Sequence, residues 1–79
     1  MLIFVKDEDI EKGDHSCKAC PVALALARAT GKPWVVSGSM AFQGLGKISG
    51  IRLPDVVQNR IKRYDKEEFM EPFSFEIDI

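Results

Sequence analysis

The chain has 79 residues, of which 46% are hydrophobic and 29% are charged, and its formal net charge is −1. This size and composition predict one folded domain, residues 1–79, and exclude a disordered chain and a second core. No apolar run reaches the roughly 20 residues that cross a bilayer, so no membrane contact is expected. The charge is unevenly distributed, because residues 1–16 and 64–79 are acidic whereas residues 17–63 carry eight basic side chains and one acidic side chain.

The first elements expected in the chain are a strand and one turn of helix. Residues 2–5 form a continuous apolar run with side chains that favour extended backbone, which predicts a short buried strand. The acidic stretch that follows predicts a single helical turn at residues 8–12, ended by Gly13. These acids also interrupt the apolar run that a secretory signal needs, so no signal peptide is expected.

A longer helix is expected over residues 18–30, where five alanines and two leucines favour helical backbone. Ser16 is placed to act as its N-cap, and Pro21 fits the first turn because its missing N–H has no helical partner there. Gly31 should end the helix. The small alanines should let it lie close against a sheet. The side chains expected on its buried face are Cys20, Leu24 and Ala27, with Val22 and Leu26 flanking them.

Three short strands are expected in the middle of the chain, at residues 34–37, 40–42 and 47–53. Glycines punctuate these runs in the manner that is typical of hairpin turns. The glycines concerned are Gly38, Gly44, Gly46 and Gly50.

A second main helix is expected over residues 54–65, opened by Pro54. Val57, Ile61 and Tyr64 recur at helical spacing and form an apolar stripe that should face the core. The basic side chains expected to remain outside are Arg60, Lys62 and Arg63.

Residues 73–79 alternate apolar and polar side chains without interruption, which predicts a half-buried strand. The N-terminal strand is a candidate partner for it, and that pairing would gather the two acidic ends of the chain on one side. The sequence therefore predicts an α+β fold with a small antiparallel sheet of about four to five short strands packed by two main helices.

Cys17 and Cys20 form a C-x-x-C pair close to the single histidine, His15. Structural zinc takes four ligands, whereas a set completed by His15 and Asp14 would crowd all of them into seven residues. A redox role has a physical basis because a helix N-terminus favours thiolate, but a redox C-x-x-C normally lies next to a strand in a βαβ unit. We expect reduced thiols, no metal and no cofactor. A thiol-redox or zinc-binding module is the alternative.

Two patterns that suggest an enzyme are incomplete. The GLGK stretch at residues 44–47 lacks the Walker A residues, since Ala41 and Ile48 stand where a glycine and a hydroxyl residue are required. Hairpin turns explain its glycines better. The histidine has only its sequence neighbours as triad partners, and their side chains point apart. We therefore expect no enzymatic activity.

The basic cluster of Arg60, Lys62 and Arg63 leaves nucleic-acid binding as a second alternative. The isoelectric point near 5.7 contradicts the usual basic signature of such proteins, and the acidic chain ends would repel a phosphate backbone. We expect a solvated helix face at these residues and no direct contact with nucleic acid.

Three segments carry a resemblance to known proteins: CKACPVALALA at residues 17–27, LPDVVQNRIKRYD at residues 53–65 and EPFSFEIDI at residues 71–79. They resemble small phage-encoded proteins that share a Cys-x-x-Cys-Pro opening, an Ala/Leu helix, a Pro-initiated helix and a terminal strand with the pattern PFxF. Those proteins tend to carry Asp directly before the first Cys, where this chain has His15 and Ser16. The resemblance implies a phage product in the host bacterial cytoplasm, similar to anti-CRISPR inhibitors of type I, in particular type I-C, surveillance complexes.

Clustered carboxylates give a separate physical argument for the same role. Surveillance complexes hold DNA in channels lined by lysine and arginine, which a small acidic protein can occupy in competition with DNA. We therefore expect a non-enzymatic monomer that binds a host CRISPR–Cas surveillance complex and blocks its binding of target DNA. The residues expected to make the contact are Asp7, Glu8, Asp9, Glu67, Glu68 and Glu71.

Overall fold

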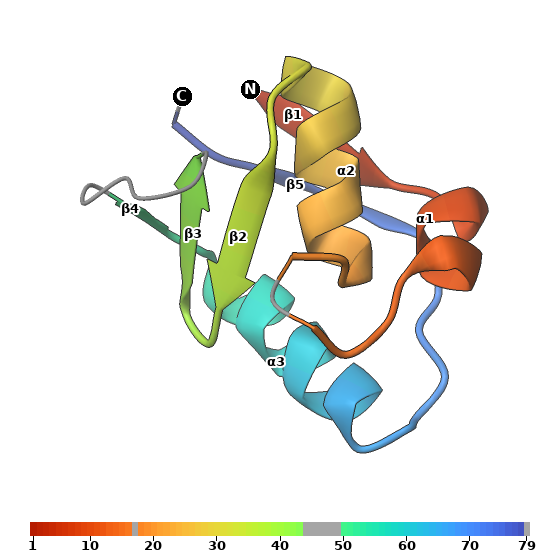
Figure 1. Ribbon diagram of the computed structural model, residues 1–79. Helices are drawn as coiled ribbons and strands as arrows, with labels where there is room; N and C mark the ends of the chain where they lie inside the picture. Colours follow the sequence, from red (N-terminus) through yellow and green to blue (C-terminus); the bar gives the residue numbers. More distant parts are fainter. Residues whose placement is uncertain (17, 44–49, 79) are drawn as a thin grey trace.

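The computed structural model describes residues 1–16, 18–43 and 50–78, and in this part of the chain three helices and five strands form an α+β fold (Figure 1). The predicted fold class is confirmed. The strands are β1 (Leu2–Val5), β2 (Trp34–Ser37), β3 (Met40–Gln43), β4 (Gly50–Arg52) and β5 (Phe73–Glu76). The helices are α1 (Asp7–Lys12), α2 (Pro21–Thr30) and α3 (Asp55–Asp65).

The strands form two small antiparallel sheets rather than the single sheet expected from the sequence. One sheet holds β1 and β5, and the other has the strand order β2–β3–β4. Helix α2 contacts both β1 and β2, so the two sheets are joined by packing on one helix (Figure 1). Short sheets of this kind need such a covering helix, because two or three strands alone cannot bury enough apolar surface.

The N-terminal and C-terminal strands pair with each other, as predicted. Ile3 lies opposite Phe75, and both side chains are buried. Leu2 lies opposite Glu76, and both are exposed. Strand β5 ends at Glu76, earlier than expected, and Ile79 lies outside the described residues.

The first residue of the chain lies beside the end of β5. The Met1 ammonium group donates to the Ile77 carbonyl oxygen at 2.6 Å, and the Ile77 N–H donates to the Met1 carbonyl oxygen at 3.0 Å. The antiparallel ladder therefore continues one residue pair beyond the two strands. Both marked ends of the chain lie on the same side of the molecule (Figure 1).

Helix α1 begins at Asp7 and ends at Lys12, with Gly13 as its C-cap, close to the predicted helical turn. The Asp9 carboxylate accepts a hydrogen bond from the Lys6 N–H at 2.9 Å, which satisfies one of the donors that the first turn leaves open. A Cβ atom at Gly13 would lie 2.8 Å from the Asp9 carbonyl oxygen and 2.8 Å from Cδ of Pro21. Glycine is therefore required here by the close approach of α1 to the start of α2.

Helix α2 begins at Pro21, later than expected, and Cys20 rather than Ser16 is its N-cap. Cys20 has extended backbone, with φ −70° and ψ 159°, and its Sγ accepts from the Ala23 N–H at 3.4 Å. The proline is the cause, because it disfavours helical backbone in the residue before it. Gly31 ends the helix with a left-handed φ of 73°, as predicted.

The buried face of α2 matches the prediction only in part, since Cys20 is buried as expected and the flanking Val22 and Leu26 are buried too. Val22, Ala25 and Leu26 are fully buried, whereas Leu24 and Ala27 are half-buried. The helix packs against α1, β1 and β2 together, so its apolar face is wider than one stripe. Alanines allow that close packing on several sides.

Strands β2 and β3 form the predicted hairpin, with Gly38 at a φ of 59° in its turn. Strand β4 begins at Gly50, inside the predicted strand 47–53, and pairs with β3. Residues 44–49, which include the expected glycine turn, lie outside the described residues.

Helix α3 matches its prediction closely. Pro54 is its N-cap, Val57 and Ile61 are buried, and Tyr64 is half-buried against the core. The core draws on both sheets and on helices α2 and α3. Its largest fully buried side chains are Ile3, Val5, Pro21, Val22, Leu26, Leu53 and Val57.

Candidate partner-binding surface

Most of the carboxylates predicted to contact a partner are exposed. The exposed ones are Asp7, Glu8, Glu67, Glu68 and Glu71. The sixth, Asp9, is only 5% exposed. Its position corrects the expectation that all three acids at the start of α1 offer surface charge.

Asp9 is an internal anchor of the fold. Its carboxylate accepts hydrogen bonds from the Lys6 N–H and from the guanidinium group of Arg28, which reaches it from α2. The same Arg28 donates to the Phe4 carbonyl oxygen at 3.0 Å, and its Nε lies 3.8 Å from Oε1 of Glu8. A buried carboxylate needs such a partner to offset its lost hydration. We therefore exclude Asp9 from the candidate surface.

The C-terminal acids lie in residues 66–72, between α3 and β5. Oε1 of Glu68 is 3.3 Å from Nε of Arg63, so α3 neutralises part of its charge. Glu67 has a left-handed φ of 65° directly after α3. Glu71, just before β5, forms no ion pair with any described residue. Glu67 likewise forms no ion pair with a described residue, whereas Glu71 lines a hollow together with Arg60 and Arg63 of α3.

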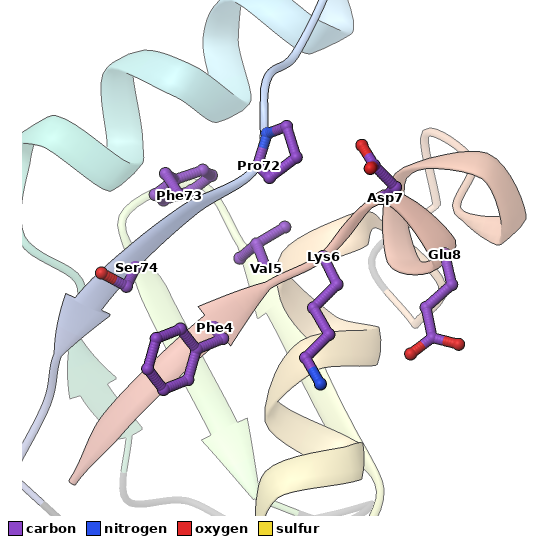
Figure 2. A pocket seen from close by; sticks show the side chains of 8 residues that line it. All are labelled: Phe4, Val5, Lys6, Asp7, Glu8, Pro72, Phe73 and Ser74. Atoms are coloured by element: carbon purple, nitrogen blue, oxygen red, sulfur yellow. The ribbon is translucent and has the colours of Figure 1, made fainter.

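A hollow of about 620 Å³ opens where β1 leads into α1 and where β5 begins (Figure 2). Residues 4–8 and 72–74 line it, and we call it the α1–β5 hollow. Phe4 and Phe73 lie at its sheet end, and the two exposed carboxylates of α1 lie at its helix end (Figure 2). Antiparallel pairing explains this grouping, because it sets the end of β1 beside the beginning of β5 and so brings the start of α1 near Pro72.

An exposed sheet face continues from the hollow. We define this outer face by its two exposed cross-strand pairs, Leu2 with Glu76 and Phe4 with Ser74. The Phe4 side chain is 52% exposed, and that of Leu2 is 45% exposed. Neighbouring apolar side chains on the surface of so small a protein are a common mark of a binding site.

The sequence prediction missed Leu2 and Phe4. Residues 2–5 form a continuous apolar run, a pattern that favours a strand buried on both faces. The pairing of the two terminal strands would have predicted that Leu2 and Phe4 are exposed. Once β1 is set against β5, alternate β1 side chains must share a face with the polar Ser74 and Glu76.

The described part of the C-x-x-C segment serves packing and capping. Cys20 is buried at the start of α2, and Cys17 lies outside the described residues. His15 is exposed and contacts α3: its Nδ1 lies 3.4 Å from Oδ1 of Asp65, and its ring centroid lies 4.8 Å from that of Tyr64. Across residues 1–16, 18–43 and 50–78 no three His, Cys, Asp or Glu side chains are grouped as a metal site requires.

Tyr64 connects α3 to the loop before α2. Its hydroxyl donates to the Gly13 carbonyl oxygen at 3.2 Å. Burial raises the pKa of the Tyr64 phenol above its usual 10.0, and the negative charge of Asp14 raises it further. Hydrogen bonds from the hydroxyl and the N–H of Ser16 lower the pKa of Asp14 below its usual 3.8. Both shifts move the groups away from neutral pH, where a general acid or base would have to titrate.

The basic side chains of α3 are partly engaged by the chain itself. Cζ of Arg60 lies 4.6 Å from the centroid of the Phe73 ring, and Arg63 pairs with Glu68. Lys62 is exposed. These contacts direct two of the three cations toward the C-terminal segment, which reduces the charge they offer to a phosphate backbone.

Comparison of the chain with protein-family models, curated proteins and solved structures finds no match. No helix within the described residues is both long enough and apolar enough to span a bilayer. The geometry of the α1–β5 hollow, the outer face and the carboxylates around them is therefore the basis for assigning a function.

Proposed function

We propose that this protein is a non-enzymatic, phage-encoded inhibitor that binds a type I CRISPR surveillance complex of the host and blocks its binding of target DNA. One observation carries the proposal: pairing of β1 with β5 sets Asp7 and Glu8 of α1 in the same hollow as Pro72, the residue that follows Glu71. The resemblance to phage-encoded anti-CRISPR proteins in three segments of the sequence supports the choice of target.

The mechanism is competition for a cationic channel. Exposed carboxylates that converge on one surface attract the lysines and arginines that otherwise hold the DNA backbone. The apolar outer face beside them, with Phe4 half-exposed, adds contact area that excludes water from the same interface. Together these features favour a protein–protein contact over a contact with nucleic acid.

The test compares two double charge reversals in a gel-shift assay of DNA binding by a purified type I-C surveillance complex. Asp7→Lys with Glu71→Lys alters the proposed surface. We expect that at least about tenfold more of this variant is needed for half-maximal inhibition, because attraction to a cationic channel becomes repulsion.

The matched control is Asp55→Lys with Glu11→Lys. Asp55 is an exposed acid in the first turn of α3, as Asp7 is in α1, and Glu11 is an exposed glutamate outside the hollow. The control changes the net charge equally and should inhibit within about twofold of the unaltered protein. Equal losses in both variants would contradict the proposed surface, and an unaltered protein that neither binds nor inhibits the complex would contradict the proposed target.

A further inference from the structure

We propose that the open edge of β5 binds an extended segment of the partner protein, which joins the sheet as an antiparallel strand with basic side chains beside Glu76 and Asp78. This inference rests on the proposed function and names how the partner is held. We call the backbone N–H and C=O groups of Ser74 and Glu76 the β5 edge.

The hydrogen bonds between β1 and β5 determine which backbone groups face outward. Met1 and Ile77 exchange two hydrogen bonds, at 2.6 Å and 3.0 Å. Because bonded and non-bonded pairs alternate along an antiparallel ladder, Ser74 and Glu76 both fall in non-bonded pairs. Their N–H and C=O groups therefore point away from β1.

The two edges of this sheet differ. On β1, the outward carbonyl oxygen of Phe4 accepts from Arg28 at 3.0 Å, and α2 packs against the strand. On β5, no described residue forms a hydrogen bond with the outward groups of Ser74 or Glu76, and β1 is the only described element that packs closely along the strand. The edge of β1 is closed, whereas that of β5 is open.

The residues around the β5 edge leave it accessible. The side chains of Ser74 and Glu76 are exposed. Pro72 stands directly before the strand at an outward position, where its missing N–H removes no hydrogen bond to β1. Proline is found in sheets at such positions of edge strands.

The backbone pattern and the charge of this edge define its occupant. Open N–H and C=O groups at every second residue are matched by another extended chain, as in β-strand addition. Glu76 and Asp78 are exposed at alternate positions, and within the described chain no cation pairs with either. Opposite charges on facing positions of two strands attract. The edge therefore fits a strand with basic side chains at alternate positions.

The cations nearest to β5 lie at its other end. Cζ of Arg60 lies 4.6 Å from the centroid of the Phe73 ring, where the strand begins. Lys6 follows Phe4 along the chain, whereas Glu76 lies opposite Leu2, four positions earlier (Figure 2). That separation is about 13 Å at the rise of a strand, so Lys6 leaves the charge of Glu76 available to a partner.

A second copy of the chain fits the same edge less well. Pairing of two β5 edges with Ser74 opposite Glu76 sets the two Glu76 carboxylates at diagonal positions of one face, where they repel each other. The register with Ser74 opposite Ser74 separates them, but it sets Glu76 opposite Pro72, which has no N–H to donate. Charge therefore favours a basic partner over self-association.

The direct test uses a heptapeptide probe, capped at both ends, with lysine at positions two, four and six, valine at positions three and five, and threonine at the ends. It is added to the ¹⁵N-labelled full chain, and amide signals are followed by NMR. We expect saturable downfield shifts and slower hydrogen exchange at the amides of Ser74 and Glu76, because each gains a hydrogen bond. A peptide with glutamate in place of lysine should bind at least about fivefold more weakly.

Two methylated peptides test the backbone contact separately from the charge. In an antiparallel bonded pair, the residue that faces Glu76 is also the one whose N–H donates to β5. Methylation of the backbone nitrogen of the central lysine removes that donor, whereas methylation at the valine of position three alters an N–H that points away. The first peptide should bind at least about fivefold more weakly than the second.

Two variants locate the binding on the protein. Ser74→Pro removes an outward N–H but no hydrogen bond to β1, and it should raise the Kd of the lysine peptide at least about fivefold, whereas Ser74→Thr should change it less than about twofold. Glu76→Lys should weaken the lysine peptide by a similar factor and strengthen the glutamate peptide. Glu11→Lys, at an exposed glutamate of α1, should change neither Kd more than about twofold. Amide spectra without peptide show whether each variant keeps the fold.

Three results would overturn the inference: no saturable shift, shifts centred away from Ser74 and Glu76, or equal binding of the two methylated peptides. Concentration-dependent shifts at the same amides without peptide would also overturn it, because they would make a second copy of the chain the occupant. The outcome is separate from that of the proposed function. Inhibition of the surveillance complex that survives Ser74→Pro sinks this inference alone, and peptide binding by a protein that never binds the complex sinks only the choice of target.

Discussion

Arg28 connects three parts of the chain through a single side chain. Its guanidinium group contacts the buried Asp9 of α1, the carbonyl oxygen of Phe4 in β1 and, at 3.8 Å, Glu8. The arginine itself stands in the last turn of α2. It therefore fixes where α1 lies against α2, and with it the helix end of the α1–β5 hollow.

Replacing Arg28 with methionine should destabilise the protein. Arg28→Met keeps much of the apolar volume but leaves the Asp9 carboxylate buried without its cation. We expect the free energy of unfolding to fall by about 2 kcal/mol, because a third of the Arg28 side chain is exposed and water can still reach part of the site. Urea denaturation followed by circular dichroism measures the change.

A second substitution separates lost charge from lost packing. Arg28→Met combined with Asp9→Asn removes both charges, and the amide oxygen of asparagine can still accept from the Lys6 N–H. This double variant should recover about half of the lost stability. A single Arg28→Met variant as stable as the unaltered chain would show that the pair adds nothing to the fold.

Sequence alone could not separate Asp9 from the exposed Asp7 and Glu8. The three acids are consecutive, and only the tertiary position of Arg28 gives one of them a buried partner. The Asp9 carboxylate accepts from the Lys6 N–H three residues earlier, but lysine has no acceptor oxygen to complete a capping box, so residues 6–9 carry no such sequence signal. Nothing local predicts the ion pair with a residue 19 positions away.

At the scale of elements, local chemistry made α1, α3 and the β2–β3 hairpin predictable. Gly38 in the turn and Pro54 before α3 act on the backbone within one or two residues, so the turn and the helix start can be predicted without any distant contact. The start of α2 was predicted wrongly because two local signals competed. Pro21 fixed extended backbone at Cys20, and this outweighed the capping preference of Ser16.

Contacts between the loop before α2 and the end of α3 form a second tie between elements. The Tyr64 hydroxyl donates to the Gly13 carbonyl oxygen, and the His15 ring lies 4.8 Å from the Tyr64 ring. The His15 Nδ1 lies 3.4 Å from Oδ1 of Asp65, at the end of α3. The helical spacing of Val57, Ile61 and Tyr64 predicted that Tyr64 faces inward, but it could not predict which loop Tyr64 contacts.

The stability of the protein should fall at alkaline pH because of Tyr64. Its pKa is raised in the folded chain, so above pH 10 the unfolded chain loses the phenol proton first and unfolding becomes more favourable. This contribution is complete below pH 10 and is lost as the pH rises through the folded-state pKa. Tyr64→Phe should cost about 1 kcal/mol at pH 7 and should lose less stability between pH 9 and 11.

Because Tyr64 is the only tyrosine, absorbance of tyrosinate near 295 nm reports its titration alone. The folded protein should titrate at higher pH than the chain in urea. Lysines ionise in the same range, so the comparison with Tyr64→Phe in urea unfolding at each pH isolates the contribution of the phenol. Titration at the same pH in both states would contradict the assigned burial.

At the scale of the whole molecule, the division into two sheets was the feature that the sequence did not predict. Each strand has a readable pattern, but whether sheets merge depends on what lies between them, and α2 packs against β1 and β2 at once. The candidate surface was predicted only in part, because it too depends on how separate elements pack against each other. Charge blocks at the chain ends and the pairing of β1 with β5 are visible in the pattern, whereas the hollow needs the relative position of α1 and β5.

The neighbouring positions of Met1 and Ile77 make the chain suitable for circular permutation. A short glycine–serine linker can join residue 79 to Met1, and the new ends can open at the β2–β3 turn beside Gly38, on the opposite side of the molecule (Figure 1). We expect the permuted protein to keep its amide spectrum and to lose no more than about 2 kcal/mol of stability. Loss of cooperative unfolding would contradict this expectation. Affinity tags on the permuted chain would then lie far from Leu2, whereas a tag placed before Met1 in the present order would stand directly beside Leu2 and the outer face.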